Sequence, residues 1–161
     1  MPDPPISRRP SESVTEMVQV VLPNDANPLG YILGGTVMHL IDIAGAIASF
    51  RHARSRVVTA AVDDLVFLHP IKIGDLIILR ARVTCAFRTS LEVQVDVFSE
   101  EALTGVRLMT SRAFLTFVAI DEQGGRVVVP PLLVETPEDE AVCAQARARR
   151  ELRLERRTHP V

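Results

Sequence analysis

Residues 27–48 read NPLGYILGGTVMHLIDIAGAIA, a loop containing glycines followed by a mostly apolar stretch of helical character. One carboxylate, Asp42, lies in the middle of this stretch among Ile, Leu and Ala. An ionised carboxylate is costly to bury unless it is paired or used, so Asp42 is the first candidate for a functional residue. Gly45 and Ala46, three and four residues further on, share its helix face and leave room for a second backbone or a ligand.

The overall composition limits the classes of function. The chain has 161 residues, enough for one domain with extensions and a substantial core. Eighteen basic and twenty acidic residues give a net charge of −2, so no overall field favours nucleic acid or a membrane surface. The sequence has no apolar stretch of the roughly 18 residues that a membrane span needs, and its first residues lack the apolar segment of a secretory signal. We therefore expect a soluble cytoplasmic protein without nucleic-acid or membrane partners.

The cysteines and histidines do not indicate a metal site. Cys85 and Cys143 are too few and too far apart in the sequence to suggest a disulfide framework or zinc ligands, which favours a reducing compartment. His39 has no second ligand at metal spacing, so we interpret it as an ordinary histidine of the helix. No metal is expected.

Hydrophobic periodicity predicts one long internal helix and several strands. The helix is expected over residues 34–52, and the strands over 14–22, 57–68, 76–83, 91–97, 106–120 and 127–129. This order predicts an α+β fold in which an antiparallel sheet curls round one helix. The expected organisation is a flexible arm over 1–13, a domain over 14–135 and a helical tail over 136–161, whose arginines, interspersed with glutamates, favour a solvated helix over a nucleic-acid site.

Several stretches, in this order, resemble the hotdog-fold acyl-CoA thioesterases, specifically the hexameric cytosolic acyl-CoA hydrolase group (YciA-like and brain acyl-CoA hydrolase-like). The resemblance spans roughly residues 17–155. Its motifs are Asn24-Asp25-Ala26-Asn27 with Gly30 and Gly34-Gly35, Ile41-Asp42-Ile43-Ala44-Gly45-Ala46, Val58-Thr59-Ala60-Ala61-Val62-Asp63, Ser90-Leu91-Glu92-Val93-Gln94-Val95, Ala113-Phe114-Leu115-Thr116-Phe117-Val118-Ala119 and Val129-Pro130-Pro131-Leu132.

The resemblance implies a function and an assembly. The activity would be hydrolysis of acyl-CoA to a free carboxylic acid and CoA, a reaction of fatty acid metabolism. Coenzyme A would be part of the substrate, and no further cofactor would be needed. A chain with one such domain would self-associate into a dimer at least, and into a hexamer built as a trimer of dimers in the family pattern.

The resemblance also implies roles for particular residues. Asp42 would activate the attacking water, with Asn27 assisting from the facing domain across the dimer. The oxyanion and substrate-binding groups would be Gly34, Gly35 and Thr59. This fits the physics of a helix start, because unpaired N–H groups and the helix dipole favour developing negative charge there.

Two further residues lie in a predicted turn. Arg88 and Ser90 would lie near the nucleotide end of CoA, or they simply form a hairpin turn. The sequence departs from the family at Tyr31, where an Asn or Asp is common, and at Leu33, where a Phe or His is common.

Other interpretations of the same residues remain open. Asp42 could be a structural carboxylate paired with an arginine or a backbone donor, and Asn27 could be a turn former, since Asn before Pro commonly initiates turns. The chain could bind acyl-CoA as a non-catalytic sensor. A hotdog hydratase or dehydratase is a further alternative, but those sequences place a His a few residues after the Asp, and His52 is too far from Asp42 to match.

Overall fold

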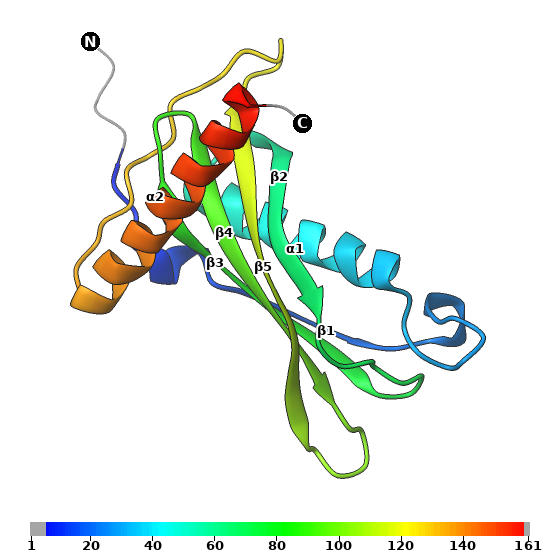
Figure 1. The fold of residues 1–161 in the computed structure, drawn as a ribbon. Coiled ribbons are helices and arrows are strands. Elements are labelled where there is room, and N and C mark those ends of the chain that lie inside the picture. Colours follow the sequence, from blue (N-terminus) through cyan, green and yellow to red (C-terminus); the bar gives the residue numbers. More distant parts are fainter. Residues whose placement is uncertain (1–5, 160–161) are drawn as a thin grey trace.

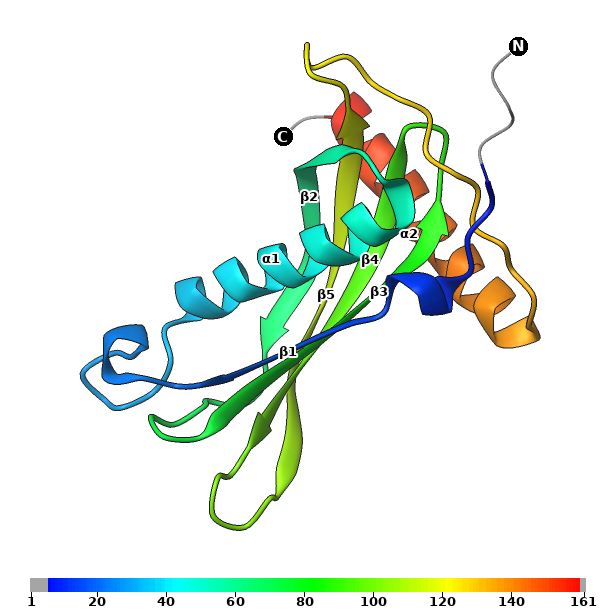
Figure 2. The same cartoon turned by 180° about the vertical axis from the view of Figure 1, so that it is seen from behind.

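The computed structural model describes residues 6–159. Five antiparallel strands form one sheet in the order β1-β3-β4-β5-β2, which curls round helix α1 (Gly34–Ala53). A second helix, α2 (Pro137–Thr158), lies diagonally across the opposite face (Figure 1 and Figure 2). The strands are β1 (Thr15–Val20), β2 (Arg56–Phe67), β3 (Leu76–Ala86), β4 (Ser90–Glu100) and β5 (Arg107–Ile120). The expected α+β fold with one central helix is confirmed.

The core lies between α1 and the concave face of the sheet. Because side chains alternate along a strand, one side of β3, β4 and β5 faces the helix. The residues of α1 that pack against this side recur three and four positions apart. The sheet residues include Leu79, Val83, Leu91, Val95, Leu115 and Phe117, and the helix residues are Val37, Leu40, Ile41, Ala44 and Ala48.

Gly45 marks the closest approach between helix and sheet. A Cβ atom on Gly45 would lie 2.9 Å from the ring of Phe117, closer than a real Cβ contact allows. The glycine therefore makes room for packing within the chain. Our expectation that it would admit a ligand or a second backbone was wrong.

Two expected elements differ from the structure. Residues 127–129 form no strand, because Val127 and Val129 donate to the carbonyls of Ala119 and Arg88 singly, without a continuous partner. The described part of the expected flexible arm is docked: the amide of Arg8 donates to Pro131 at 3.0 Å, and the hydroxyl of buried Ser13 accepts from the amide of Val83 at 2.9 Å. Residues 1–5 of that arm lie outside the described residues.

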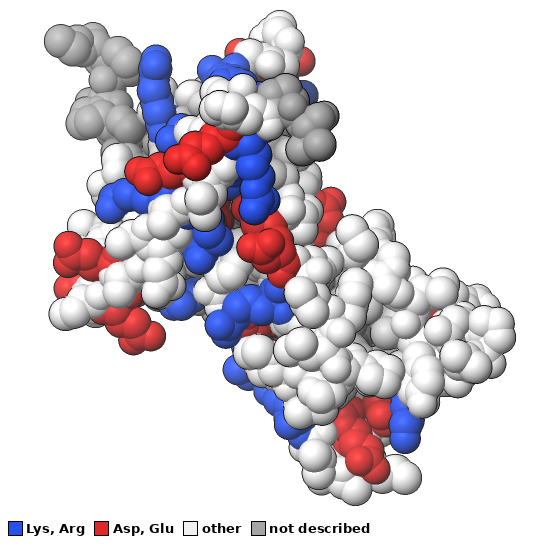
Figure 3. All heavy atoms as spheres, in the orientation of Figure 1, with Lys and Arg blue, Asp and Glu red and all other residues white. Residues whose placement is uncertain are grey.

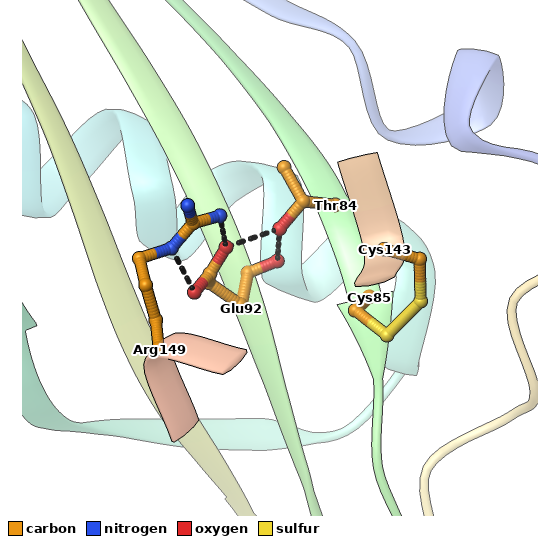
Figure 4. The surroundings of a disulfide bond; sticks show 5 residues. All are labelled: Thr84, Cys85, Glu92, Cys143 and Arg149. Carbon is orange, nitrogen blue, oxygen red and sulfur yellow. Dashed lines mark hydrogen bonds and ion pairs between the residues drawn. A yellow bond between two sulfur atoms is a disulfide. The ribbon is translucent and has the colours of Figure 1, made fainter. Parts of the chain in front are cut away.

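The structure corrects the prediction for the cysteines. Cys85 near the end of β3 and Cys143 near the start of α2 form a disulfide across a sequence separation of 58 (Figure 4). The separation was misleading because α2 folds back over β3, which brings the two residues together. Our expectation of two unpaired cysteines was wrong, and the inference of a reducing compartment loses that support.

Buried polar contacts also join α2 to the sheet. Glu92 of β4 is only 1% exposed and accepts from Arg149 at 3.0 Å and 2.8 Å and from the hydroxyl of Thr84 at 2.7 Å (Figure 4). The guanidinium of Arg149 also lies 3.6 Å from the ring centroid of Phe114, a cation–π contact. The predicted helix is therefore present. Its outer face is solvated, as expected, whereas its inner face is bound to the sheet.

Candidate functional site

Asp42 lies on α1, two turns after the helix begins, on the side that the sheet leaves partly open. The hydroxyl of Thr59 on β2 donates to its Oδ1 at 2.5 Å. Among residues 6–159 no arginine or backbone amide pairs with this carboxylate, so Thr59 holds one oxygen while Oδ2 stays free. The observed partner is therefore neither the buried arginine nor the backbone donor of the structural interpretation.

The pairing of β2 with β5 explains why Thr59 faces the helix. Thr59 pairs with Phe117, whose ring lies on the α1 side of the sheet, and the pairing register then shifts between Thr59 and Ala61. A bulge of this kind re-aims side chains and often lies beside functional sites. Sequence alternation alone gives no sign of it.

The start of α1 presents unpaired backbone donors. Leu33 precedes the helix without a capping side chain, and the first intrahelical bond runs from the amide of Val37 to the carbonyl of Leu33. The N–H groups of Gly34 and Gly35 therefore have no helical partner. Nothing lies within 4 Å of the position a Cβ on Gly35 would take, so an incoming group can reach this backbone.

A pocket of about 320 Å³ opens beside this helix start. Its volume is at the lower end of the range for small-molecule sites. The lining includes Asn27, Gly34, Val37, Phe67, His69 and Ser111. The surface over the preceding loop and the start of α1 carries few charged side chains (Figure 3), as a site for an apolar group requires.

Phe67, His69 and Ser111 line the pocket although nothing in the sequence indicated it. Phe67 ends β2, His69 follows it, and Ser111 lies on β5. They reach the helix start only because β2 pairs with β5 at the edge of the sheet, a pairing that no local sequence signal specifies.

Asn27 shapes the loop in front of the helix. Its Oδ1 accepts from the amides of Leu29 at 3.0 Å and Tyr31 at 3.2 Å, which is the turn-forming role. The residue also lines the pocket, whereas Asp42 and Thr59 do not. Asp42 follows Gly34 by eight residues, roughly 12 Å along a helix axis. Within one chain, Asn27 therefore lies at the helix start and Thr59 lies at Asp42. These two places on α1 remain apart.

The remaining candidates lie elsewhere. Arg88 and Ser90 belong to the β3–β4 hairpin, where the amide of Phe87 donates to the Ser90 carbonyl at 2.8 Å, and neither residue lines the pocket. His39 is exposed on α1. Within residues 6–159 no cluster of three His, Cys, Asp or Glu side chains could hold a metal ion. The same residues include no helix long and apolar enough to span a membrane.

Comparison with known sequences agrees with this arrangement. A model of the thioesterase superfamily matches residues 29–106. An uncharacterized acyl-CoA thioester hydrolase of Bacillus subtilis, YkhA, is 37% identical and aligns over 96% of this chain and 90% of its own length. The human cytosolic acyl coenzyme A thioester hydrolase is 36% identical over 76% of this chain, and the match spans about a third, 34%, of that relative.

Solved structures give the same result. An apo-hexameric acyl-CoA thioesterase superposes with a TM-score of 0.89 at 41% identity, covering 94% of this chain and 97% of its own. The acyl-CoA hydrolase of Staphylococcus aureus, solved with butyryl coenzyme A and coenzyme A, gives 0.86 at 34% identity over 95% and 93%. Three variants of that enzyme replace one asparagine, one aspartate or one threonine by alanine. The chain belongs to the thioesterase superfamily, in its hotdog-fold group of acyl-CoA thioester hydrolases.

Proposed function

We propose that this protein hydrolyses acyl-CoA thioesters, with Asp42 as the general base. The observation that carries the proposal is the Asp42–Thr59 pair, in which a hydroxyl fixes one carboxylate oxygen and leaves the other open. A general base needs such a positioned, unpaired oxygen within reach of water. The names of the relatives and the CoA complexes of the S. aureus hydrolase support the same reaction.

In the proposed reaction, Asp42 carries one proton from water to the departing sulfur. Oδ2 of Asp42 takes a proton from water while the water oxygen bonds to the thioester carbonyl carbon. The carbonyl oxygen becomes an oxyanion, which the N–H groups of Gly34 and Gly35 are placed to stabilise. The C–S bond then breaks, and the proton passes from Asp42 to the departing sulfur. The products are a carboxylic acid and free CoA, and no additional cofactor is required.

A second copy of the chain would complete the site. β2 is an edge strand with one side unpaired, and exposed strand edges readily pair with another chain. Apolar residues are exposed on β2 and on the neighbouring side of α1, namely Val58, Val62, Met38 and Phe50. We propose that two copies pair along this side, so that Asn27 and the helix start of one chain meet Asp42 of the other. The hexameric neighbours support further assembly into a trimer of dimers.

Two further assignments accompany this proposal. Arg88 and Ser90 remain candidates for contact with the nucleotide end of CoA, because Arg88 is exposed and its guanidinium has no ion-pair partner among residues 6–159. The cytosolic relatives support a cytoplasmic location.

Release of free thiol from acyl-CoA tests the function directly. The wild-type protein should release CoA thiol, and Asp42→Asn should lower kcat by about 10²- to 10⁴-fold, because an amide cannot accept the proton from water. Asp64→Asn is the matched control: this aspartate is exposed on β2 with a φ of 48°, a conformation that asparagine tolerates. Tight acyl-CoA binding without thiol release would instead indicate a sensor.

A further inference from the structure

We propose that Arg153 of α2 is a positioning residue for hydrolysis, acting through its ion pair with Asp63 to hold the part of β2 that presents Thr59 to Asp42. The inference rests on the proposed function. Helix α2 lies on the opposite face of the sheet from Asp42. Through this ion pair, α2 would influence the reaction without touching the site.

The ion pair is shielded from solvent. Nη1 of Arg153 donates to Oδ2 of Asp63 at 3.0 Å, and the two side chains are only 16% and 15% exposed. Removing one partner of such a pair leaves an uncompensated, poorly hydrated charge. Breaking this contact therefore costs more than breaking an exposed ion pair such as Arg9–Glu135.

α2 is a fixed platform from which Arg153 reaches the edge strand. The disulfide ties Cys143 to β3, and Arg149 two turns later reaches Glu92 on β4 (Figure 4). Arg153 lies one further turn along and therefore on the same helix face. Successive contacts thus carry α2 from β3 across β4 and β5 to β2, which is the order of the strands in the sheet (Figure 1).

β2 needs such an anchor because its register is irregular. Within one chain it pairs only with β5 among the described residues, and its register shifts between Thr59 and Ala61 and again between Asp63 and Val66. Asp64, inside the second irregularity, has a φ of 48°. Only residues 61–63 are regularly paired between the two shifts.

The anchor acts on the residues between these shifts. Each shift leaves a residue of β2 without a regular partner on β5, so the ladder is interrupted on both sides of this segment. Fixing Asp63 from outside restricts the position of the first bulge, and so helps to keep the preceding pair Thr59–Phe117, which turns Thr59 toward Asp42, in register.

Arg153→Gln should lower kcat roughly tenfold to a hundredfold with KM unchanged, since small misplacements remote from the chemistry have effects of this size. Asp63→Asn should reproduce the loss. Arg147→Gln is the matched control, because Arg147 is an exposed arginine on the same helix with no ion pair among the described residues. Its kcat should equal that of the wild type.

A double-mutant cycle separates positioning from simple loss of stability. In a Thr59→Val background, Arg153→Gln should have no further effect on kcat, because the bond it maintains is already absent. Multiplicative losses in the two backgrounds, or a lower melting temperature with an unchanged kcat per folded molecule, would overturn the inference.

A measurement independent of activity distinguishes failure of the inference from failure of the proposed function. Arg153→Gln should speed amide hydrogen exchange at residues 61–63, and Arg147→Gln should not. If the wild-type protein hydrolyses no acyl-CoA, the proposed function fails, whereas this exchange pattern still decides whether Arg153 holds the strand. Equal exchange in all three proteins refutes the anchor.

Discussion

Gly45 fixes how closely α1 approaches the sheet, because the ring of Phe117 occupies the space where its Cβ would be. Gly45→Ala should therefore force the helix or the ring to shift, and we expect a loss of about 1–3 kcal/mol in the free energy of unfolding, the usual effect of overpacking. Chemical denaturation measures it. Gly35→Ala is the control, since its Cβ would meet nothing within 4 Å. Equal stability of Gly45→Ala and the wild type would show that the ring moves freely.

His52 makes stability depend on pH. Its side chain is fully buried near the end of α1, where Nε2 bonds the carbonyl of Pro130 at 2.7 Å and Nδ1 has no hydrogen-bond partner within residues 6–159. Burial lowers the pKa of His52 below 6.5, nearby Arg8 lowers it further, and the Pro130 carbonyl and Glu12 oppose the shift. His52 is therefore harder to protonate in the folded protein than in the unfolded chain.

The sign of the His52 effect follows from linkage. Neutral His52 makes its full contribution to the free energy of unfolding above the pKa of about 6.5 that it has in the unfolded chain. Below that pH the contribution decreases, by at most about 1.4 kcal/mol per pH unit, until the pH reaches the lowered pKa of the folded state. Urea unfolding at pH 7, 6 and 5 should show a steeper decrease for the wild type than for His52→Gln. Parallel decreases would exclude His52 as a contributor.

At the scale of elements, the disulfide is the strongest constraint on α2. It closes a loop that contains all of β4 and β5, with a sequence separation of 58. Loop-closure entropy for that length gives about 4 kcal/mol of stabilisation at 25 °C. Reductant should therefore lower the melting temperature of the wild type and leave that of Cys85→Ala/Cys143→Ala unchanged. A reductant-insensitive wild type would mean that the two thiols do not pair in solution.

The elements differ in how far the sequence could predict them. The long helix and five strands were predictable because their apolar residues recur with the right periods, and Asp42 stood out against its apolar neighbours. The 127–129 strand was wrong because three valines indicate extended backbone but not a partner strand. The disulfide, the Thr59–Asp42 bond and the lining of the pocket by Phe67 and His69 depend on which strands become neighbours, and only the folded topology supplies that.

The whole molecule has to be an oligomer if the proposed site is shared. Asn27→Ala and Asp42→Asn proteins should each be nearly inactive, and mixing them after dissociation should restore activity. A mixed dimer has one interface with both lesions and one with neither. Random exchange makes half of the dimers mixed, with one working site in two, so recovery should approach a quarter of the wild-type rate. Thiol release measures it, and native mass spectrometry confirms exchange. A mixture that exchanges subunits yet stays inactive would place both residues in the same chain's site.

The sheet order also determines when the site can form during synthesis. β1 and β2 are separated in the sequence only by α1 and its loops, yet they lie at opposite edges of the sheet, and Thr59 pairs with Phe117. Translation proceeds at about 5–20 residues per second, so Thr59 waits several seconds for its partner to emerge. Until then β2 has no partner strand, whereas α1 can already pack against β1, β3 and β4 as they emerge. A chain that stalls between Thr59 and Phe117 therefore keeps β2 unpaired on both edges for the whole pause, and unpaired strand edges readily associate with other chains.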